Sequence, residues 1–356
     1  MIGSRNDSEH SLTTLQKISN NYAPIHGYLS LLVCIIGSVF NLVTIFIFRN
    51  KQMVSPINRL LLAIAAVNLL IMLSYIPFAL LFFIIYGQEE SQKRNTYSAI
   101  CYLLFHVLWT NTFHSTSVWL TLSVALFRFI HLTLRDGKNR CDLSKANLTI
   151  FLSIVGAILI NIPQTLVYSI KRYDDEEKNT SWYYLSTDND KYGDHANINL
   201  VQFALLALLV KITPCILLVV LSIILIRIIH SAHRKYTAMQ RRRPSSIKYT
   251  TSPNEERRQR QTNQTTQMLI AIILVFVVIE LPQGILFVLS GLLVDFFDDI
   301  YWPLGNFWDL LTIIGCCINF FLYCRMSSQF CQLLLSILRS ISFRTEQNHD
   351  TVSTDL

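Results

Sequence analysis

Long apolar stretches separated by short polar segments dominate the hydrophobic pattern of this chain. A helix needs about 20 consecutive apolar residues to cross a bilayer. Seven stretches meet that length, and they cover approximately residues 26–48, 60–86, 99–127, 146–170, 198–226, 266–294 and 303–324. Backbone groups in lipid must bond to each other, and the period-two alternation of a membrane barrel is absent from the sequence. The pattern therefore predicts an all-α membrane protein with a bundle of seven transmembrane helices.

The ends of the chain are polar and fall outside this bundle, which is expected to span residues 26–325. Residues 1–25 lack the apolar core of a signal peptide and are expected to form an extracellular tail. The run from Ser328 to Ile341 is typical of a short amphipathic helix on the inner leaflet. This expected eighth helix lies within the segment 326–341. Residues 342–356 are then a cytoplasmic tail.

Composition excludes a soluble protein, and the charge pattern predicts an orientation. Hydrophobic residues make up 52% of the 356 residues and charged residues 15%, against about 25% charged in a typical globular domain. The segment 227–260 carries ten Lys and Arg residues opposed only by Glu255 and Glu256. Lys and Arg near helix ends favour the cytoplasm. With seven crossings the N-terminus is then extracellular, in the plasma membrane.

The predicted outer loops carry the opposite charge. The loop 171–197 has seven acidic and four basic residues, and the last outer loop contains Asp295, Asp298 and Asp299. An acidic mouth attracts cationic ligands. The alternative is that these acids only keep the surface soluble. Sequons at Asn6 and Asn179 are predicted to be glycosylated.

Cysteine usage predicts how the large outer loop is held. Only Cys101 is expected near the outer surface, so an intrachain disulfide there is not possible. The loop is expected to be held by packing, with Trp182, Tyr183 and Tyr184 as candidates.

A set of residues occurs in register with the helices. The set comprises Asn41 in the first helix, Arg128 at the end of the third, helix-breaking Pro214 and Pro282 in the fifth and sixth, and Asn319 and Tyr323 in the seventh. This ordered set resembles the rhodopsin-like (class A) G-protein-coupled receptors over nearly the whole chain. The resemblance implies that Arg128 contacts a heterotrimeric G protein.

Three segments carry a closer resemblance: 113–122 in the third helix, 211–215 in the fifth and 276–284 in the sixth. They are similar to invertebrate myosuppressin and FMRFamide-like peptide receptors and to related nematode chemoreceptors. This resemblance implies an amidated neuropeptide ligand ending in Arg-Phe-amide, and inhibitory G-protein coupling. Such peptides are cationic, which fits an acidic mouth.

The chain also departs from the wider class. Asn68 stands where the second helix of that class carries an aspartate that holds sodium, and Phe127 replaces the aspartate before the helix-three arginine. A neutral amide lacks the charge that a cation requires. We therefore expect a hydrogen-bonded network without a metal, and responses insensitive to sodium. This network, together with the prolines and aromatic residues expected to move on activation, forms one expected set. The set comprises Asn41, Asn68, Ser117, Pro214, Phe276, Pro282, Asn319 and Tyr323.

Ionisable residues inside the bilayer cost about 2.5–3.5 kcal/mol each and need a partner. The sequence places Lys211 before Pro214 and Glu280 before Pro282. We expect them to form a buried cluster with His114 at the pocket floor, which a ligand rearranges. The alternative is a static pair that only fixes packing.

Asp309 is expected to pair with an arginine of the ligand, or else to face water at a helix end. The complete expected binding set is His114, Lys211, Glu280, Asp309, Asn111 and Gln283.

Other functions and partners remain open alternatives. A transporter or channel would also use intramembrane charges, but the sequence contains no repeated halves. A chemosensory receptor for a small molecule is the runner-up among receptors. No nucleophile constellation, phosphate loop or zinc spacing indicates an enzyme, and no cofactor or nucleic acid is expected. The tail could bind arrestin, and its end, Thr354-Asp-Leu356, a PDZ-type domain.

Overall fold

The structure, a computed structural model, describes residues 14–87, 92–133, 141–175, 180–186, 201, 204–241, 253–293 and 296–339. Within these parts, seven helices are long and apolar enough to cross a membrane. The predicted seven-helix fold is confirmed. The main helices are α1 (Thr14–Phe48), α2 (Pro56–Ala79), α3 (Tyr97–Thr133), α5 (Leu143–Val167), α7 (Thr213–Arg241), α8 (Pro253–Leu292) and α9 (Trp302–Met326).

Shorter elements extend these helices. Two strands follow α5, β1 (Ser169–Asp175) and β2 (Thr180–Ser186), and a 3-10 turn, η1 (Lys51–Met53), precedes α2. Three π-helical turns lie next to α2, α7 and α9: η2 (Leu80–Ile85), η3 (Leu206–Ile212) and η4 (Phe297–Tyr301). Residues 328–339 are also helical, which confirms a helix after the seventh span.

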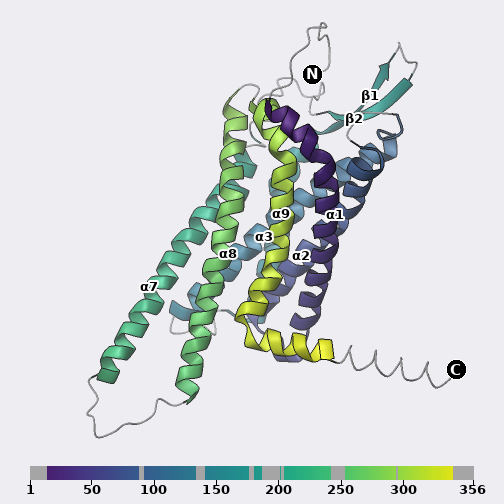
Figure 1. The fold of residues 1–356 in the computed structure, drawn as a ribbon. Helices are drawn as coiled ribbons and strands as arrows, with labels where there is room; N and C mark the ends of the chain where they lie inside the picture. Colours follow the sequence, from purple (N-terminus) through teal and green to yellow (C-terminus); the bar gives the residue numbers. More distant parts are fainter. Residues whose placement is uncertain are drawn as a thin grey trace, which may run out of the picture.

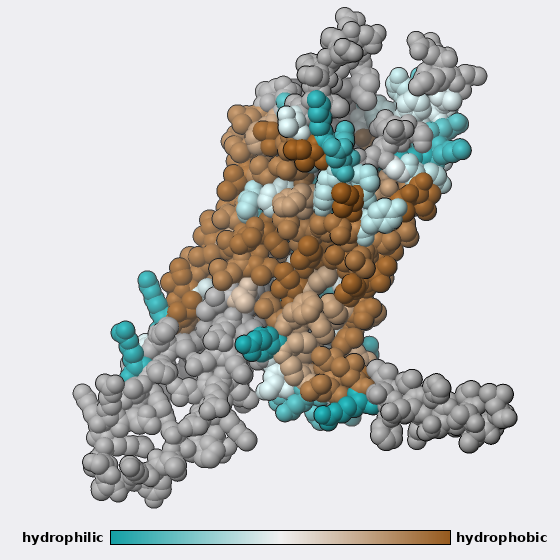
Figure 2. Space-filling model, in the orientation of Figure 1, coloured by the Kyte–Doolittle hydropathy of each residue, from teal (hydrophilic) through white to brown (hydrophobic). Residues whose placement is uncertain are grey.

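The helices form one elongated bundle. α1 packs against α2 and α9, α2 against α3, α3 against α5 and α7, and α8 against α9 and η3. The start of α1 and the β1–β2 hairpin lie at one end, whereas residues 328–339 lie across the opposite end (Figure 1). Figure 2 shows a broad apolar belt around the middle, with polar residues at both ends of the described surface. This is the distribution expected of a bundle whose outer face contacts lipid.

Polar caps start two of the helices. The Ser55 hydroxyl accepts a hydrogen bond from the Asn58 backbone at 3.1 Å, and Pro56 occupies the first helical position of α2. Asp142 accepts one from the Lys145 backbone at 2.8 Å at the start of α5. These caps satisfy backbone N–H groups that a first turn leaves without an intrahelical partner. Both helices consequently begin a few residues before their apolar stretches.

Several helices differ in extent from the apolar stretches. α1 begins at Thr14, within the segment expected to be an irregular tail, and α3 continues to Thr133. Arg128 therefore lies inside a helix and not at its end, because a helix needs only backbone hydrogen bonds and continues beyond the apolar residues. α5 instead ends at Val167, before the expected end at residue 170, because Ser169 and Ile170 pair with β2.

The two prolines expected to break helices behave differently. Pro214 follows the π-helical turn η3, where the chain changes to the regular helix α7. Proline has no N–H, so the carbonyl one turn earlier loses its usual partner, and a wider turn accommodates this loss. α8 continues through Pro282 without interruption. The expected break there is wrong, because a proline inside a transmembrane helix removes one backbone hydrogen bond without having to end the helix.

The loop after α5 forms an antiparallel hairpin that the sequence pattern did not indicate. Tyr173 lies opposite Trp182, with ring centroids 4.8 Å apart. The Tyr183 backbone donates a hydrogen bond to the Asn95 carbonyl at 2.9 Å, and its ring lies 5.3 Å from that of Tyr97. All eight cysteines of the chain are free thiols. Trp182 and Tyr183 thus pack as expected, and they hold the hairpin against the start of α3.

Gly37 lets α1 pack closely against α2 and α9. A Cβ atom at this position would lie 2.5 Å from Cys317 Sγ and 2.5 Å from Met72 Cε. One turn further along α1, the Asn41 amide donates hydrogen bonds to the Gly37 carbonyl at 2.9 Å and the Cys316 carbonyl at 3.4 Å. The absence of a side chain at Gly37 is therefore part of the contact between the three helices.

We expect Gly37→Ala to lower the free energy of unfolding by about 1–3 kcal/mol, because the methyl group overpacks the core. Thermal unfolding of the purified protein measures this change. Gly156→Ala is the matched control, since no atom lies within 4 Å of its Cβ position and Ala is favoured over Gly in a helix. Equal unfolding temperatures for the two variants would contradict the close packing.

Candidate functional site

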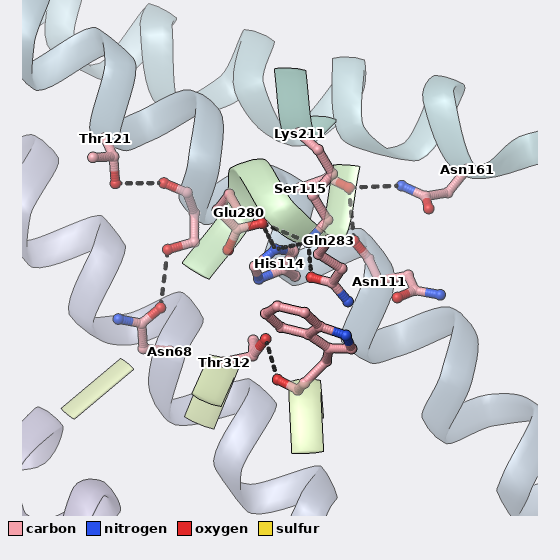
Figure 3. Close-up of polar contacts among 12 residues, drawn as sticks. Asn68, Asn111, His114, Ser115, Thr121, Asn161, Lys211, Glu280, Gln283 and Thr312 are labelled. Carbon is pink, nitrogen blue, oxygen red and sulfur yellow. Dashed lines mark hydrogen bonds and ion pairs between the residues drawn. The ribbon is translucent and has the colours of Figure 1, made fainter. Parts of the chain in front are cut away.

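Three ionisable side chains from three helical elements meet inside the bundle (Figure 3). The Lys211 Nζ of η3 donates a hydrogen bond to Glu280 Oε2 of α8 at 2.5 Å, and lies 2.9 Å from His114 Nε2 of α3. His114 Nε2 lies 3.2 Å from the same carboxylate oxygen. The side chains of Lys211 and Glu280 are only 6% and 4% exposed. We call His114, Lys211 and Glu280 the charged trio, and the structure brings them together as the sequence predicts.

The hydrogen bonds of the trio indicate which atoms are available to a ligand. An ammonium group has three donors, and the Lys211 Nζ has three partners: the Glu280 carboxylate, His114 Nε2, and Gln283 Oε1 at 2.8 Å. If His114 Nε2 accepts from Lys211, the ring proton is on Nδ1. Glu280 Oε1 and His114 Nδ1 take no part in these contacts. An acceptor and a donor therefore remain beside a saturated ammonium group.

Because the ion pair is buried, each charge depends on the other for its stabilisation. A lone charge in the bilayer interior costs several kcal/mol, and removing one partner of a buried pair costs about 3–5 kcal/mol. Lys211 and Glu280 also connect η3 to α8, which are far apart in the sequence. The pair therefore fixes the position of one helix relative to the other.

Gly284 allows this close approach, and the sequence analysis did not identify its role. A Cβ atom at Gly284 would lie 2.7 Å from Lys211 Cβ and 3.1 Å from Ile212 Cγ1. Glycine inside a helix is unfavourable by about 1 kcal/mol relative to alanine, so its presence is a signal of close packing. That signal was available in the sequence one residue after Gln283.

The neutral members of the expected binding set lie beside the trio. Gln283 Nε2 donates a hydrogen bond to the Tyr301 hydroxyl at 3.3 Å, so it links Lys211 to η4. Asn111 lies three residues before His114, on the same side of α3, and is half-buried. Its backbone carbonyl accepts a hydrogen bond from Ser115 at 2.8 Å. Tyr301 is a member of this site that the sequence did not indicate.

A cavity extends from the trio toward the middle of the bundle. Its polar lining consists of Asn68, His114, Ser117, Thr121, Glu280, Thr312 and Asn319, and its apolar lining includes Phe276 and Ile279. The Ser117 hydroxyl donates a hydrogen bond to Asn68 Oδ1 at 3.0 Å (Figure 3). Four members of the expected network, Asn68, Ser117, Phe276 and Asn319, thus line one cavity.

Asn41, the fourth polar member, lies apart from this cavity. Its amide bonds to carbonyls of α1 and α9 and contacts Met72 Sδ at 3.6 Å. The expected convergence of Asn41 with Asn68 and Ser117 is therefore wrong in detail. Asn41 instead links α1 to α9, since its amide nitrogen donates a hydrogen bond to the Cys316 carbonyl.

Asp309 is exposed, yet it faces groups of the bundle interior. Its carboxylate lies within electrostatic range of Tyr75 in α2, Tyr301 in η4 and Lys211 in η3. Asp309 does not line the cavity beside the trio. Its pairing with an arginine of the ligand and its place at a helix end facing water both stay predictions.

Arg128 and Tyr323 lie together toward the other end of the bundle. The Arg128 side chain is 8% exposed and within electrostatic range of the Tyr323 hydroxyl. Tyr323 is 2% exposed and packs against Phe48 and Phe330, at centroid distances of 5.3 and 5.8 Å. Contact of Arg128 with a G protein would require a conformation that exposes it. Asn6 and Asn179 lie outside the described residues, as do residues 340–356.

Comparison with known proteins identifies the family. The sequence model of the family described as "Serpentine type 7TM GPCR chemoreceptor Srw" matches residues 28–340, which include most of the first span, the other six spans and the charged trio. The chain belongs to this family. It is therefore a multi-pass membrane receptor that couples to a G protein, and membership implies an extracellular ligand.

Three curated relatives are similar to most of this receptor. They are the G-protein coupled receptor dmsr-1 of Caenorhabditis elegans (28% identical, covering 88% of this chain and 68% of that protein), the Sex peptide receptor of Drosophila melanogaster (25%, 86% and 71%) and the Sex peptide receptor-related protein 2 of C. elegans (26%, 87% and 72%). The narrower resemblance to myosuppressin and FMRFamide-like peptide receptors stays a prediction.

We expect Gly284→Ala to destabilise the receptor by about 1–3 kcal/mol, because the added methyl group forces α8 away from η3 and stretches the ion pair. Thermal unfolding of the purified receptor measures the effect. Gly305→Ala is the control, since nothing lies within 4 Å of its Cβ position. A Gly284→Ala variant as stable as the Gly305→Ala control would show that the close approach is not needed.

Proposed function

We propose that this receptor lies in the plasma membrane with its N-terminus outside and is activated by an amidated, cationic neuropeptide of the FMRFamide-like or myosuppressin-like class. The single observation that carries the proposal is the charged trio at the edge of an internal cavity. A buried charged group beside a cavity is suited to binding one end of a ligand.

The free atoms of the trio favour a carboxamide over a carboxylate. Glu280 Oε1 can accept a hydrogen bond, and His114 Nδ1–H can donate one in the tautomer whose Nε2 accepts from Lys211. A carboxamide matches both groups. A carboxylate is only an acceptor, and the negative charge of Glu280 would repel it. Lys211 cannot donate a hydrogen bond to it without losing one of its three existing bonds. The chemistry of the site therefore supports an amidated peptide end.

Exposed acidic residues support a cationic ligand. Asp309 of α9 and Asp174 of β1 are both exposed, and Asp174 pairs with Arg172 at 2.8 Å. The names of two relatives also refer to a peptide, the sex peptide. Expected glycosylation at Asn6 and Asn179 is consistent with an outer N-terminus and outer loop.

In the proposed mechanism, the ligand's amide competes for Glu280 and His114, which weakens the bond between η3 and α8. Movement of α8 changes the cavity below, where Phe276 and Asn319 form part of the lining. Tyr323 follows Asn319 by one turn on α9 and lies beside Arg128. Release of Arg128 then allows it to contact a G protein of the inhibitory class. Arrestin and a PDZ-type domain are proposed partners of the tail.

The second candidate ligand is a small chemosensory molecule, which the family description favours. It predicts activation without a peptide. The two candidates differ in what should activate the receptor in a reporter cell.

The full chain is expressed in a reporter cell and screened with amidated peptides, each paired with its free acid. We expect an Arg-Phe-amide peptide to be the more potent member of its pair by roughly 30-fold or more, because an unpaired charge in the site costs about 2 kcal/mol or more. Toxin inactivation of inhibitory G proteins should abolish the response, and untransfected cells are the control. Activation by a small molecule with no active peptide would favour the chemosensory alternative.

A further inference from the structure

Gln283 of α8 lies on the side of the charged trio that faces the hairpin end of the bundle. It follows Glu280 by three residues on the same face of α8, which corresponds to a rise of about 4.5 Å. α8 runs toward the end of the bundle that holds the β1–β2 hairpin (Figure 1). The cavity lies on the other side of the trio, where Phe276 and Ile279 of α8, which precede Glu280, form part of its lining. A ligand that reaches the trio from the hairpin end therefore meets Gln283 first.

The Gln283 side chain caps the ammonium group of Lys211. Gln283 Oε1 accepts a hydrogen bond from Lys211 Nζ at 2.8 Å (Figure 3), and the residue is only 7% exposed. An ammonium group has three protons, and the other two are directed at Glu280 and His114. Loss of the Gln283 oxygen would thus leave one N–H of a buried lysine without its acceptor.

Tyr301 fixes the orientation of the Gln283 amide. Gln283 Nε2 donates a hydrogen bond to the Tyr301 hydroxyl of η4 at 3.3 Å. In the opposite orientation the NH₂ group would face the ammonium, so a donor would meet a donor. The Tyr301 ring is itself held by aromatic contacts, since its centroid lies 4.8 Å from that of Phe287 and 5.4 Å from that of Phe297. Tyr301 is therefore a positioning residue for the Gln283 oxygen.

The cap on Lys211 changes which end group the site attracts. A free N–H of a lysine would form a charge-assisted hydrogen bond with a carboxylate, about twice as strong as a bond between neutral groups. A ligand group bonded to Glu280 Oε1 lies close to this ammonium, because the other oxygen of the same carboxylate is bonded to Lys211 Nζ. With the third N–H occupied by Gln283, a carboxylate meets the repulsion of Glu280 without a hydrogen bond from Lys211.

We propose that Gln283 determines the end-group specificity of this receptor: by occupying the third N–H of Lys211, it makes the site select a carboxamide and reject a carboxylate. This inference rests on the proposed function and assigns its selectivity to one side chain. The sequence places Gln283 among the residues that bind the ligand, whereas in this proposal it acts on the ligand through Lys211.

A purely structural role of Gln283 leads to a different result. If Gln283 only satisfied a buried ammonium group, its loss would weaken the fold and the binding of both end groups alike. If Gln283 sets the specificity, its loss makes a carboxylate bind more tightly, because the released N–H gains an acceptor with a negative charge. A gain of binding is a result that general damage does not produce.

The test uses the purified full-length receptor and two probes, N-acetyl-Arg-Phe-amide and its free acid, which differ only in the end group. Titrating each probe into thermal unfolding experiments gives its affinity, because a ligand that binds the folded state stabilises it by an amount set by its concentration and Kd. We expect the wild-type receptor to prefer the amide. Gln283→Leu, which has no acceptor atom, should increase the affinity for the free acid by about tenfold or more.

Matched variants separate the cap from other effects of the substitution. Gln283→Glu keeps an oxygen acceptor for Lys211 whether or not the new carboxyl group is protonated, and should keep the preference for the amide. Tyr301→Phe should increase the affinity for the free acid by less than Gln283→Leu does, because the amide oxygen remains but is no longer held. Tyr102→Phe removes a hydroxyl that donates to the Ser74 carbonyl at 2.6 Å, and should behave as wild type.

The proposal is overturned if Gln283→Leu binds the free acid no better than wild type does, if Gln283→Glu has the same effect as Gln283→Leu, or if wild type does not prefer the amide. Should Gln283→Leu fail to fold, Tyr301→Phe decides the question. An affinity of Tyr301→Phe for the free acid equal to that of Tyr102→Phe then overturns the proposal.

The outcome is separable from that of the proposed function. A preference for the amide that Gln283→Leu lowers supports the inference even when no amidated peptide activates the receptor in the reporter cell. Conversely, activation by an amidated peptide, together with an unchanged affinity of Gln283→Leu for the free acid, supports the proposed function and overturns the role of Gln283.

Discussion

The hydrogen-bonded ion pair between Lys211 and Glu280 is the interaction on which the interior of this receptor depends. It joins a π-helical turn to α8 in a part of the molecule where either charge alone would be strongly unfavourable. Gly284 allows the two elements to approach, and His114 adds α3 to the contact. A ligand that competes for one atom of this cluster therefore acts on three helical elements at once.

The seventh span, α9, connects this cluster to both ends of the bundle. Asp309, Thr312, Asn319 and Tyr323 follow one another at helical spacings that repeat on one face. Asp309 is exposed, Thr312 and Asn319 line the cavity beneath the trio, and Tyr323 lies beside buried Arg128. These residues thus form a row along α9 from the proposed ligand site to the proposed G-protein contact, and movement of α8 against α9 would affect them.

The sequence could predict the spans and the trio because both follow from strong, local rules. Apolar length alone indicates seven spans, and the cost of burying a charge requires that Lys211 and Glu280 find each other. The hairpin and the contact of His26 with Tyr75 could not be predicted in this way. β1 and β2 are held by contacts of Tyr183 with Asn95 and Tyr97, and His26 meets Tyr75 through the packing of two helices. The continuity of α8 through Pro282 likewise depends on neighbours that a proline rule does not include.

The most direct test of the central claim is a double-mutant cycle on signalling with Lys211→Met, Glu280→Gln and the double variant, in which Arg-Phe-amide-stimulated G-protein activation is measured at matched surface expression. If the trio is the trigger, the effects of the two single substitutions on potency will be strongly non-additive, with a coupling energy of about 1 kcal/mol or more. Additive effects on signalling would contradict the account and leave the pair as a static element of packing.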